Sequence, residues 1–96
     1  MVPKGVGQGD TYASYNLAQL YRKTDPGKAL ALLQTLAAKD DNSPAYASIV
    51  YTLSEMYYFG EGTAVNYPEA YRLTLIAANL GYPDAQHRVG AMLYQV

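Results

Sequence analysis

His87 is the one histidine of the chain and the first residue to consider for catalysis. A histidine works as a general base when a matched nucleophile or proton donor lies beside it. The sequence places no such group next to His87, and the absence of cysteine excludes a thiol nucleophile. We therefore expect His87 to pack or to contact a partner, and we expect the protein not to be an enzyme.

Three short motifs could bind a ligand, but each lacks the context that the chemistry needs. Segments 5–9 and 60–62 are rich in glycine, as phosphate loops are, yet no strand pattern precedes them and no Gly-Lys-Ser/Thr follows. Segment 40–42, with two aspartates and an asparagine, could hold calcium, but it lacks the glycine and the distal glutamate of an EF-hand loop. The interpretation that fits each motif is a turn or a tail, so no cofactor and no metal ion is expected.

The composition limits the class of protein. Half of the 96 residues are hydrophobic and 16% are charged, which excludes a disordered chain and suits one domain. The seven lysines and arginines are scattered and the net charge is −1, so a nucleic-acid partner is not expected. No run of about 20 apolar residues could span a membrane, and residues 1–10 contain no apolar signal-peptide core. We expect a cytoplasmic protein or the mature part of a periplasmic one.

An internal repeat is visible at a spacing of 36 residues. Tyr15–Tyr21 becomes Tyr51–Tyr57 after one shift and His87–Leu93 after a second. In each copy a ring is followed by a polar, an aliphatic, a small and a variable residue, and then by two large apolar residues. Periods of 20–50 residues are typical of solenoids and other repeat arrays.

Apolar side chains recur at helical spacing in this repeat, which predicts that each copy begins with a helix. The predicted core stripes of the first two copies are Ala13, Leu17, Leu20, Tyr21 and Val50, Leu53, Met56, Tyr57. The small residues Ala18, Ser54 and Gly90 are expected to let neighbouring helices approach closely.

Proline, asparagine and glycine mark the helix ends. Asp25-Pro26 and Ser43-Pro44 each place a capping residue before a proline, and Asn66-x-x-Glu69 has capping-box spacing. The predicted helices span about 11–23, 26–39, 44–59, 67–80 and 83–94, and no strand pattern appears. Residues 1–10 are expected to be a flexible tail, and residues 11–96 the repeat domain.

From Leu53 onward the chain resembles the Sel1-like repeat, a relative of the tetratricopeptide repeat. The residues that stand at the spacing of that family's pattern are Leu53, Tyr57, Gly60, Gly62, Ala70, Ala77, Ala78, Gly81 and Ala85. The pattern is not followed at Ser54, Thr63, Asn66, Glu69, Leu73 and Ile76. The resemblance implies an all-α fold, a right-handed α-solenoid of antiparallel helix pairs with about two and a half repeats. It also implies a protein–protein interaction role, often in bacterial proteins.

The predicted function is that of an adaptor, a non-enzymatic module that binds a protein or peptide through the concave face of its first helices. Two alternatives stay open. One is an immunity or inhibitor protein that occludes a bacterial toxin or effector. The other is a structural protein that self-associates as a homo-oligomer through exposed repeat ends.

Residues opposite the core stripes of the first helices are expected to line the binding groove. They are Tyr12, Tyr15, Gln19, Arg22, Ser48, Tyr51, Glu55, Tyr58, Asp84, His87 and Tyr94. Stacking is expected to bring Tyr15, Tyr51 and His87 into one row. A second row would hold Arg22, Tyr58 and Tyr94. Such rows suit a segment with apolar anchors, since tyrosine is enriched among interface hot spots.

Overall fold

The computed structural model describes residues 4–39 and 45–94, with side chains described for 11–39 and 45–91. This part of the chain is helical and contains no strand. The helices in chain order are α1 (Lys4–Thr24), α2 (Pro26–Lys39), α3 (Tyr46–Phe59), α4 (Tyr67–Asn79) and α5 (Pro83–Tyr94). The all-α class is therefore confirmed.

The first helix is longer than its pattern predicts. α1 begins at Lys4 instead of near residue 11, so residues 4–10 continue the helix in spite of their glycines. Extending an existing helix costs far less than nucleating one, and the packed turns beyond residue 10 supply the nucleus. Whether segment 1–10 is mobile stays a prediction, and residues 1–3 lie outside the described residues.

The helix starts confirm most of the capping signals. Asn66 accepts a hydrogen bond from the Glu69 amide, at 3.1 Å from Oδ1 to N, and Asp25 Oδ1 accepts one from the Lys28 amide at 3.3 Å. The reciprocal half of the capping box does not form, because the Asn66 amide donates to the Tyr57 carbonyl oxygen and the Glu69 carboxylate binds Arg72. Ser43-Pro44 lies outside the described residues, and so does segment 40–42.

The core is built around α3, which packs on α2 and on α4. The predicted stripe of the second copy is confirmed, since Val50, Leu53 and Met56 are buried and Tyr57 is half-buried. For the first copy, the prediction that the stripe is buried is wrong for its aliphatic side chains. Leu17 is 44% exposed and Leu20 is 63% exposed. The pattern correctly marks an apolar face of α1, but no described element covers that face.

The loop between α3 and α4 fits closely against the start of α2. Gly62 has a φ of +74°, and a Cβ atom there would lie 2.6 Å from the carbonyl oxygen of Pro26. Only glycine permits both the backbone conformation and this approach.

The small residues expected at helix contacts have mixed outcomes. Ala18 and Ser54 are buried, as expected for close helix contacts. The expectation for Gly90 is wrong, because a Cβ atom there would meet nothing within 4 Å.

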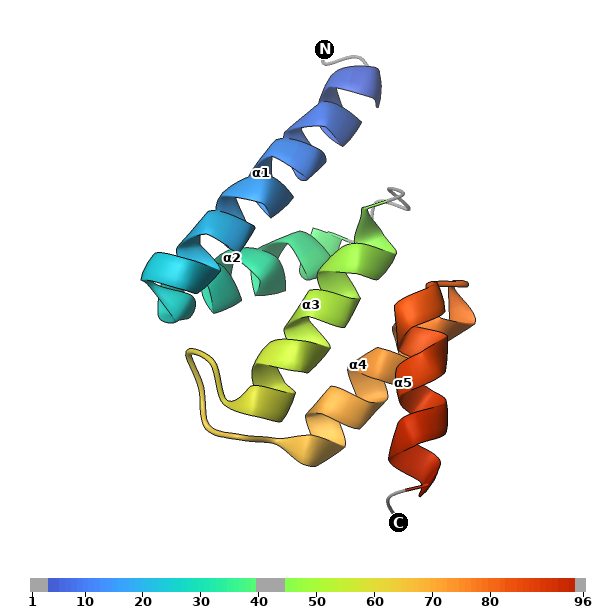
Figure 1. The fold of residues 1–96 in the computed structure, drawn as a ribbon. Helices are drawn as coiled ribbons and strands as arrows, with labels where there is room; N and C mark the ends of the chain where they lie inside the picture. Colours follow the sequence, from blue (N-terminus) through green and yellow to red (C-terminus); the bar gives the residue numbers. More distant parts are fainter. Residues whose placement is uncertain (1–3, 40–44, 95–96) are drawn as a thin grey trace.

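Figure 1 shows α1, α3 and α5 running downward, with α2 and α4 carrying the chain back between them. Each helix packs mainly against its neighbours in the chain, and the fold measures 49 × 29 × 17 Å. No helix in the described residues is long and apolar enough to cross a membrane. The finer description, a right-handed solenoid of antiparallel pairs, stays a prediction.

Candidate functional site

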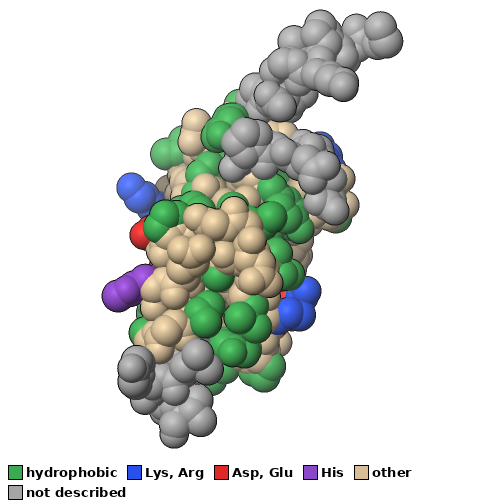
Figure 2. All heavy atoms as spheres, turned by 90° about the vertical axis from the view of Figure 1, so that its right-hand side faces the viewer, with side chains coloured by type: hydrophobic (Ala, Val, Ile, Leu, Met, Phe, Trp, Pro, Cys, Tyr) green, Lys and Arg blue, Asp and Glu red, His purple; other side chains and the backbone are tan. Residues whose placement is uncertain are grey.

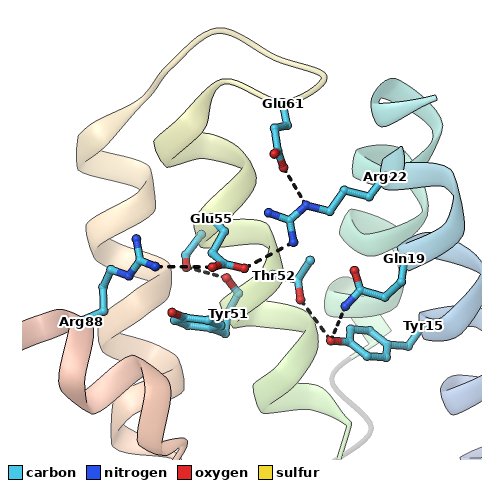
Figure 3. A network of polar contacts seen from close by, with 9 residues as sticks. Tyr15, Gln19, Arg22, Tyr51, Thr52, Glu55, Glu61 and Arg88 are labelled. Atoms are coloured by element: carbon cyan, nitrogen blue, oxygen red, sulfur yellow. Dashed lines mark hydrogen bonds and ion pairs between the residues drawn. The ribbon is translucent and has the colours of Figure 1, made fainter. Parts of the chain in front are cut away.

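A polar network joins the three first helices α1, α3 and α5 (Figure 3). At its centre Glu55 of α3 accepts from Arg22 of α1, with 3.3 Å between Nη1 and Oε1, and from Arg88 of α5, with 3.4 Å between Nη2 and Oε2. The three side chains are each one-quarter exposed or less. One carboxylate thus holds two cations from helices far apart in the sequence. We call Arg22, Glu55, Glu61 and Arg88 the charge network.

Glu61 extends the charge network to the α3–α4 loop. Its Oε1 atom accepts a hydrogen bond of 2.6 Å from Arg22 Nε. Burial lowers the pKa of Arg22, but the hydrogen bond and charge of Glu61, together with Glu55, outweigh burial and raise it. Arg22 therefore stays charged and ties α1 to both the middle of α3 and the loop after it.

Tyr15, in the middle of α1, is a second point at which α1 is joined to α3. Its hydroxyl accepts a hydrogen bond of 2.7 Å from Gln19 Nε2 and lies 3.2 Å from Thr52 Oγ1. Since Gln19 donates to the tyrosine oxygen, the tyrosine proton is free to reach Thr52. Figure 3 shows this cluster and the charge network along the same side of α3.

Arg88 also lies over a group of aromatic rings on α3. Its guanidinium carbon is 5.7 Å from the ring centroid of Tyr51, 5.6 Å from Tyr58 and 6.0 Å from Phe59. A cation within about 6 Å of a ring is attracted to its face. Tyr51 is buried, with its ring centroid 5.1 Å from that of Tyr82. The arginine is therefore held by rings on one side and by Glu55 on the other.

The rings next to Arg88 reach the solvent. Phe59 is 56% exposed and Tyr67 is 60% exposed, and both lie against the half-buried Tyr58, with ring centroids 5.0 and 5.2 Å from it. We call Tyr58, Phe59, Tyr67 and Arg88 the aromatic surface. It combines large apolar rings, tyrosine hydroxyls and a guanidinium, the side chains that are enriched in interface hot spots.

The structure brings together about half of the predicted binding residues. Those in contact with the network or with Arg88 are Tyr15, Gln19, Arg22, Tyr51, Glu55 and Tyr58. Tyr12, Asp84 and His87 are exposed, and Ser48 is half-buried. In the described part of the chain, none of these four side chains makes a hydrogen bond or an ion pair with the charge network. The side chain of Tyr94 lies outside the described residues.

The interactions in the described residues join other pairs than the predicted rows do, and the rows themselves stay a prediction. Tyr15 meets Thr52 and not Tyr51, and Arg88, not His87, lies over Tyr51. Likewise, Arg22 reaches Glu55 and Glu61 rather than Tyr58. A shift of 36 residues aligns equivalent backbone positions, but long side chains reach one turn or more along the neighbouring helix.

Sequence reasoning missed Arg88, Glu61 and the exposed Phe59. One signal could have found Arg88, because Arg22, Glu55 and Arg88 alternate in charge at a constant spacing of 33 residues. No comparable pattern marks Phe59 and Glu61, whose positions depend on how the chain leaves α3.

A hollow lies between α2, α3 and α4, apart from the aromatic surface. It is a cavity of about 290 Å³ with an apolar floor that includes Val50, Leu53 and Leu73. At its rim Gln34 Nε2 donates a 2.8 Å hydrogen bond to the Tyr57 hydroxyl. Helical geometry places these α3 residues on the opposite side of the helix from Tyr51 and Glu55. We call this hollow the α2–α4 pocket.

The surface on the α5 side of the molecule has no cluster of charged side chains among its described residues. Figure 2 shows apolar side chains scattered among polar ones on this face, with basic side chains only at its margins. Among the residues whose side chains are described, no three or more His, Cys, Asp or Glu gather where they could hold a metal ion.

No protein-family model, no curated protein and no solved structure matches the chain.

Proposed function

We propose that this protein is a non-enzymatic binding module that recognises a protein or peptide segment through the aromatic surface on α3, α4 and α5. The observation that carries the proposal is the position of Arg88, one cation of α5 held over three rings of α3. One of these rings, Phe59, is exposed, and the exposed ring of Tyr67 lies against Tyr58. Large exposed rings cost solvation energy in an isolated protein, and a cluster of them commonly marks a binding surface.

Rigidity supports this proposal. The charge network fixes Arg22, Glu55 and Arg88 against one another before any partner arrives. Binding then costs less side-chain entropy than it would on a surface of free, flexible side chains. The network is balanced, with two arginines facing two glutamates. We therefore expect aromatic and apolar anchors to dominate affinity, and the guanidinium of Arg88 to orient a carbonyl or carboxylate of the partner.

The Sel1-like resemblance and the solenoid belong to the same proposal. Support comes from the double shift of 36 residues and from helices at the expected places. In such an array α1, α3 and α5 would line a concave face, and the aromatic surface would lie at its α5 end. Tyr12 and His87, both exposed, would then extend the same face toward its edges.

A random peptide library displayed on phage and selected on the immobilised protein tests the proposal directly. Peptides rich in aromatic or large apolar residues should be enriched. Phe59→Ala and Arg88→Ala should each weaken the binding of a selected peptide by about 2 kcal/mol, roughly 30-fold, as removal of a central hot spot does. Titration calorimetry gives the affinities.

Matched controls separate this surface from general effects of truncation. Leu80→Ala removes another exposed apolar side chain, and Arg72→Ala removes another arginine that is paired with a glutamate. Both variants should bind the peptide within about twofold of the parent. Equal affinity for all four variants, or no enrichment of any peptide, contradicts the proposed function.

A further inference from the structure

The outward face of α1 exposes positions that the repeat buries elsewhere. Leu17 and Leu20 are 44% and 63% exposed, whereas Leu53 and Met56, which stand 36 residues later, are 3% and 0% exposed. Ala13 is also exposed, while its equivalents Ile49 and Ala85 are buried. These positions are thus buried in the second copy and exposed in the first. We call Ala13, Leu17 and Leu20 the α1 stripe.

The α1 stripe is separate from the candidate binding surface. At 100° per residue it lies opposite Tyr15, Gln19 and Arg22, the side of α1 that faces α3. α2 packs on a third side, where Ala18 is buried. A helix can therefore dock on the α1 stripe without disturbing the charge network.

We infer that the α1 stripe is covered by the same stripe of a second copy, in a symmetric dimer with two antiparallel α1 helices. An isologous contact requires a surface that is complementary to itself. We consider an antiparallel pair of α1 helices centred between Asn16 and Leu17. In this register Ala13 of one copy faces Leu20 of the other, so a small side chain packs against a large one. No member of the stripe is charged, so burying it leaves no unpaired charge.

Charge at the end of α1 selects the antiparallel orientation. Lys23 lies in the last turn beside Arg22, which Glu55 and Glu61 already neutralise, and no acidic residue lies in the first turn. Parallel helices would set the two basic ends side by side, whereas antiparallel helices separate them and oppose their dipoles favourably. The net charge of −1 per chain adds little repulsion between copies.

Size-exclusion chromatography with light scattering over a concentration series tests this dimer. Because the seam is small, we expect a dissociation constant on the order of 100 μM, so the measured mass should rise from 10.5 kDa toward twice that value as concentration rises. The double variant Leu17→Glu/Leu20→Glu should remain a monomer at every concentration. Leu80→Glu, at a leucine 53% exposed and off the α1 stripe, should dimerise like the parent.

If circular dichroism shows that the double variant folds poorly, cross-linking provides an independent test of the dimer. The chain has no cysteine, so Asn16→Cys places one thiol near the expected two-fold axis, and Thr35→Cys places one on the exposed side of α2. A short bis-maleimide should link Asn16→Cys into a dimer and leave Thr35→Cys unlinked. A parent that is monomeric up to about 1 mM, a dimer that survives in the double variant, or linkage at Thr35 and not at Asn16 overturns the inference.

Discussion

At the scale of single residues, Glu55 is the side chain at the centre of the charge network. It accepts from two arginines that belong to different helices, and no other described carboxylate bridges three elements in this way. Removing its charge leaves Arg22 with Glu61 alone and Arg88 with only the rings beneath it. A partly buried cation that loses its carboxylate is costly, more so than an exposed one.

We expect Glu55→Gln to lower the free energy of unfolding by about 1–2 kcal/mol, because the shape is kept while the shared negative charge is lost. Urea denaturation followed by circular dichroism measures the change. Glu69→Gln is the matched control, since Glu69 is also paired with an arginine, but that arginine is 59% exposed and belongs to the same helix. Its cost should stay below about 0.5 kcal/mol. Equal costs for the two variants would show that the charge network does not join the helices.

The sequence indicated only part of this chemistry. Tyr15, Gln19, Arg22 and Glu55 were identified because helical periodicity shows which side chains share a face. Arg88 was missed because the repeat alignment pairs it with Thr52, a residue with no charge to suggest an ion pair. Ion pairs between helices depend on side-chain reach, and a shift in register does not encode that reach.

At the scale of helices and loops, the loop of residues 60–66 joins the two helices of the second copy and does more than reverse the chain. Gly62 lies against the backbone at the start of α2, and Glu61 binds Arg22 near the end of α1. The loop therefore positions the first helix pair relative to the second. Its glycine spacing is readable in the sequence, but its contact with Pro26 is not.

Gly62→Ala should destabilise the protein by about 2 kcal/mol or more, because the new Cβ would clash with the Pro26 carbonyl and the φ of +74° strains alanine. Gly90→Ala is the matched control inside helix α5, where a Cβ has open space. That substitution should stabilise by about 0.5–1 kcal/mol through helix propensity. Thermal unfolding of both variants checks the contrast, and two shifts of the same sign would contradict the close contact of loop and α2.

Helix ends were predicted well wherever a residue with a fixed backbone preference stands there. Pro26 and Pro83 begin their helices, and Asn66 caps α4. The start of α1 was not predicted, because glycines disfavour a helix locally while an existing helix extends cooperatively. The exposure of Leu17 and Leu20 was not predictable either. An apolar stripe shows which face seeks a neighbour, but not whether the chain supplies one.

At the scale of the whole molecule, two features concern α1. Equal spacing brings α1, α3 and α5 to one side, where the charge network joins them (Figure 3). Among the described residues, no helix covers the outward face of α1, where Leu17 and Leu20 are exposed. The aromatic surface lies on α3, α4 and α5, whereas the proposed dimer seam lies on the outward face of α1, so each can be tested without the other.

The central claim is that residues from separate helices form one binding surface around Arg88. Backbone amide chemical shifts, measured by nuclear magnetic resonance while a selected peptide is titrated into the ¹⁵N-labelled protein, test this claim most directly. We expect the largest shifts at Tyr58, Phe59, Tyr67 and Arg88, with smaller ones at Glu55. Shifts confined to one helix, or concentrated around Ala37, Tyr46 and Ile76 in the α2–α4 pocket, would contradict it.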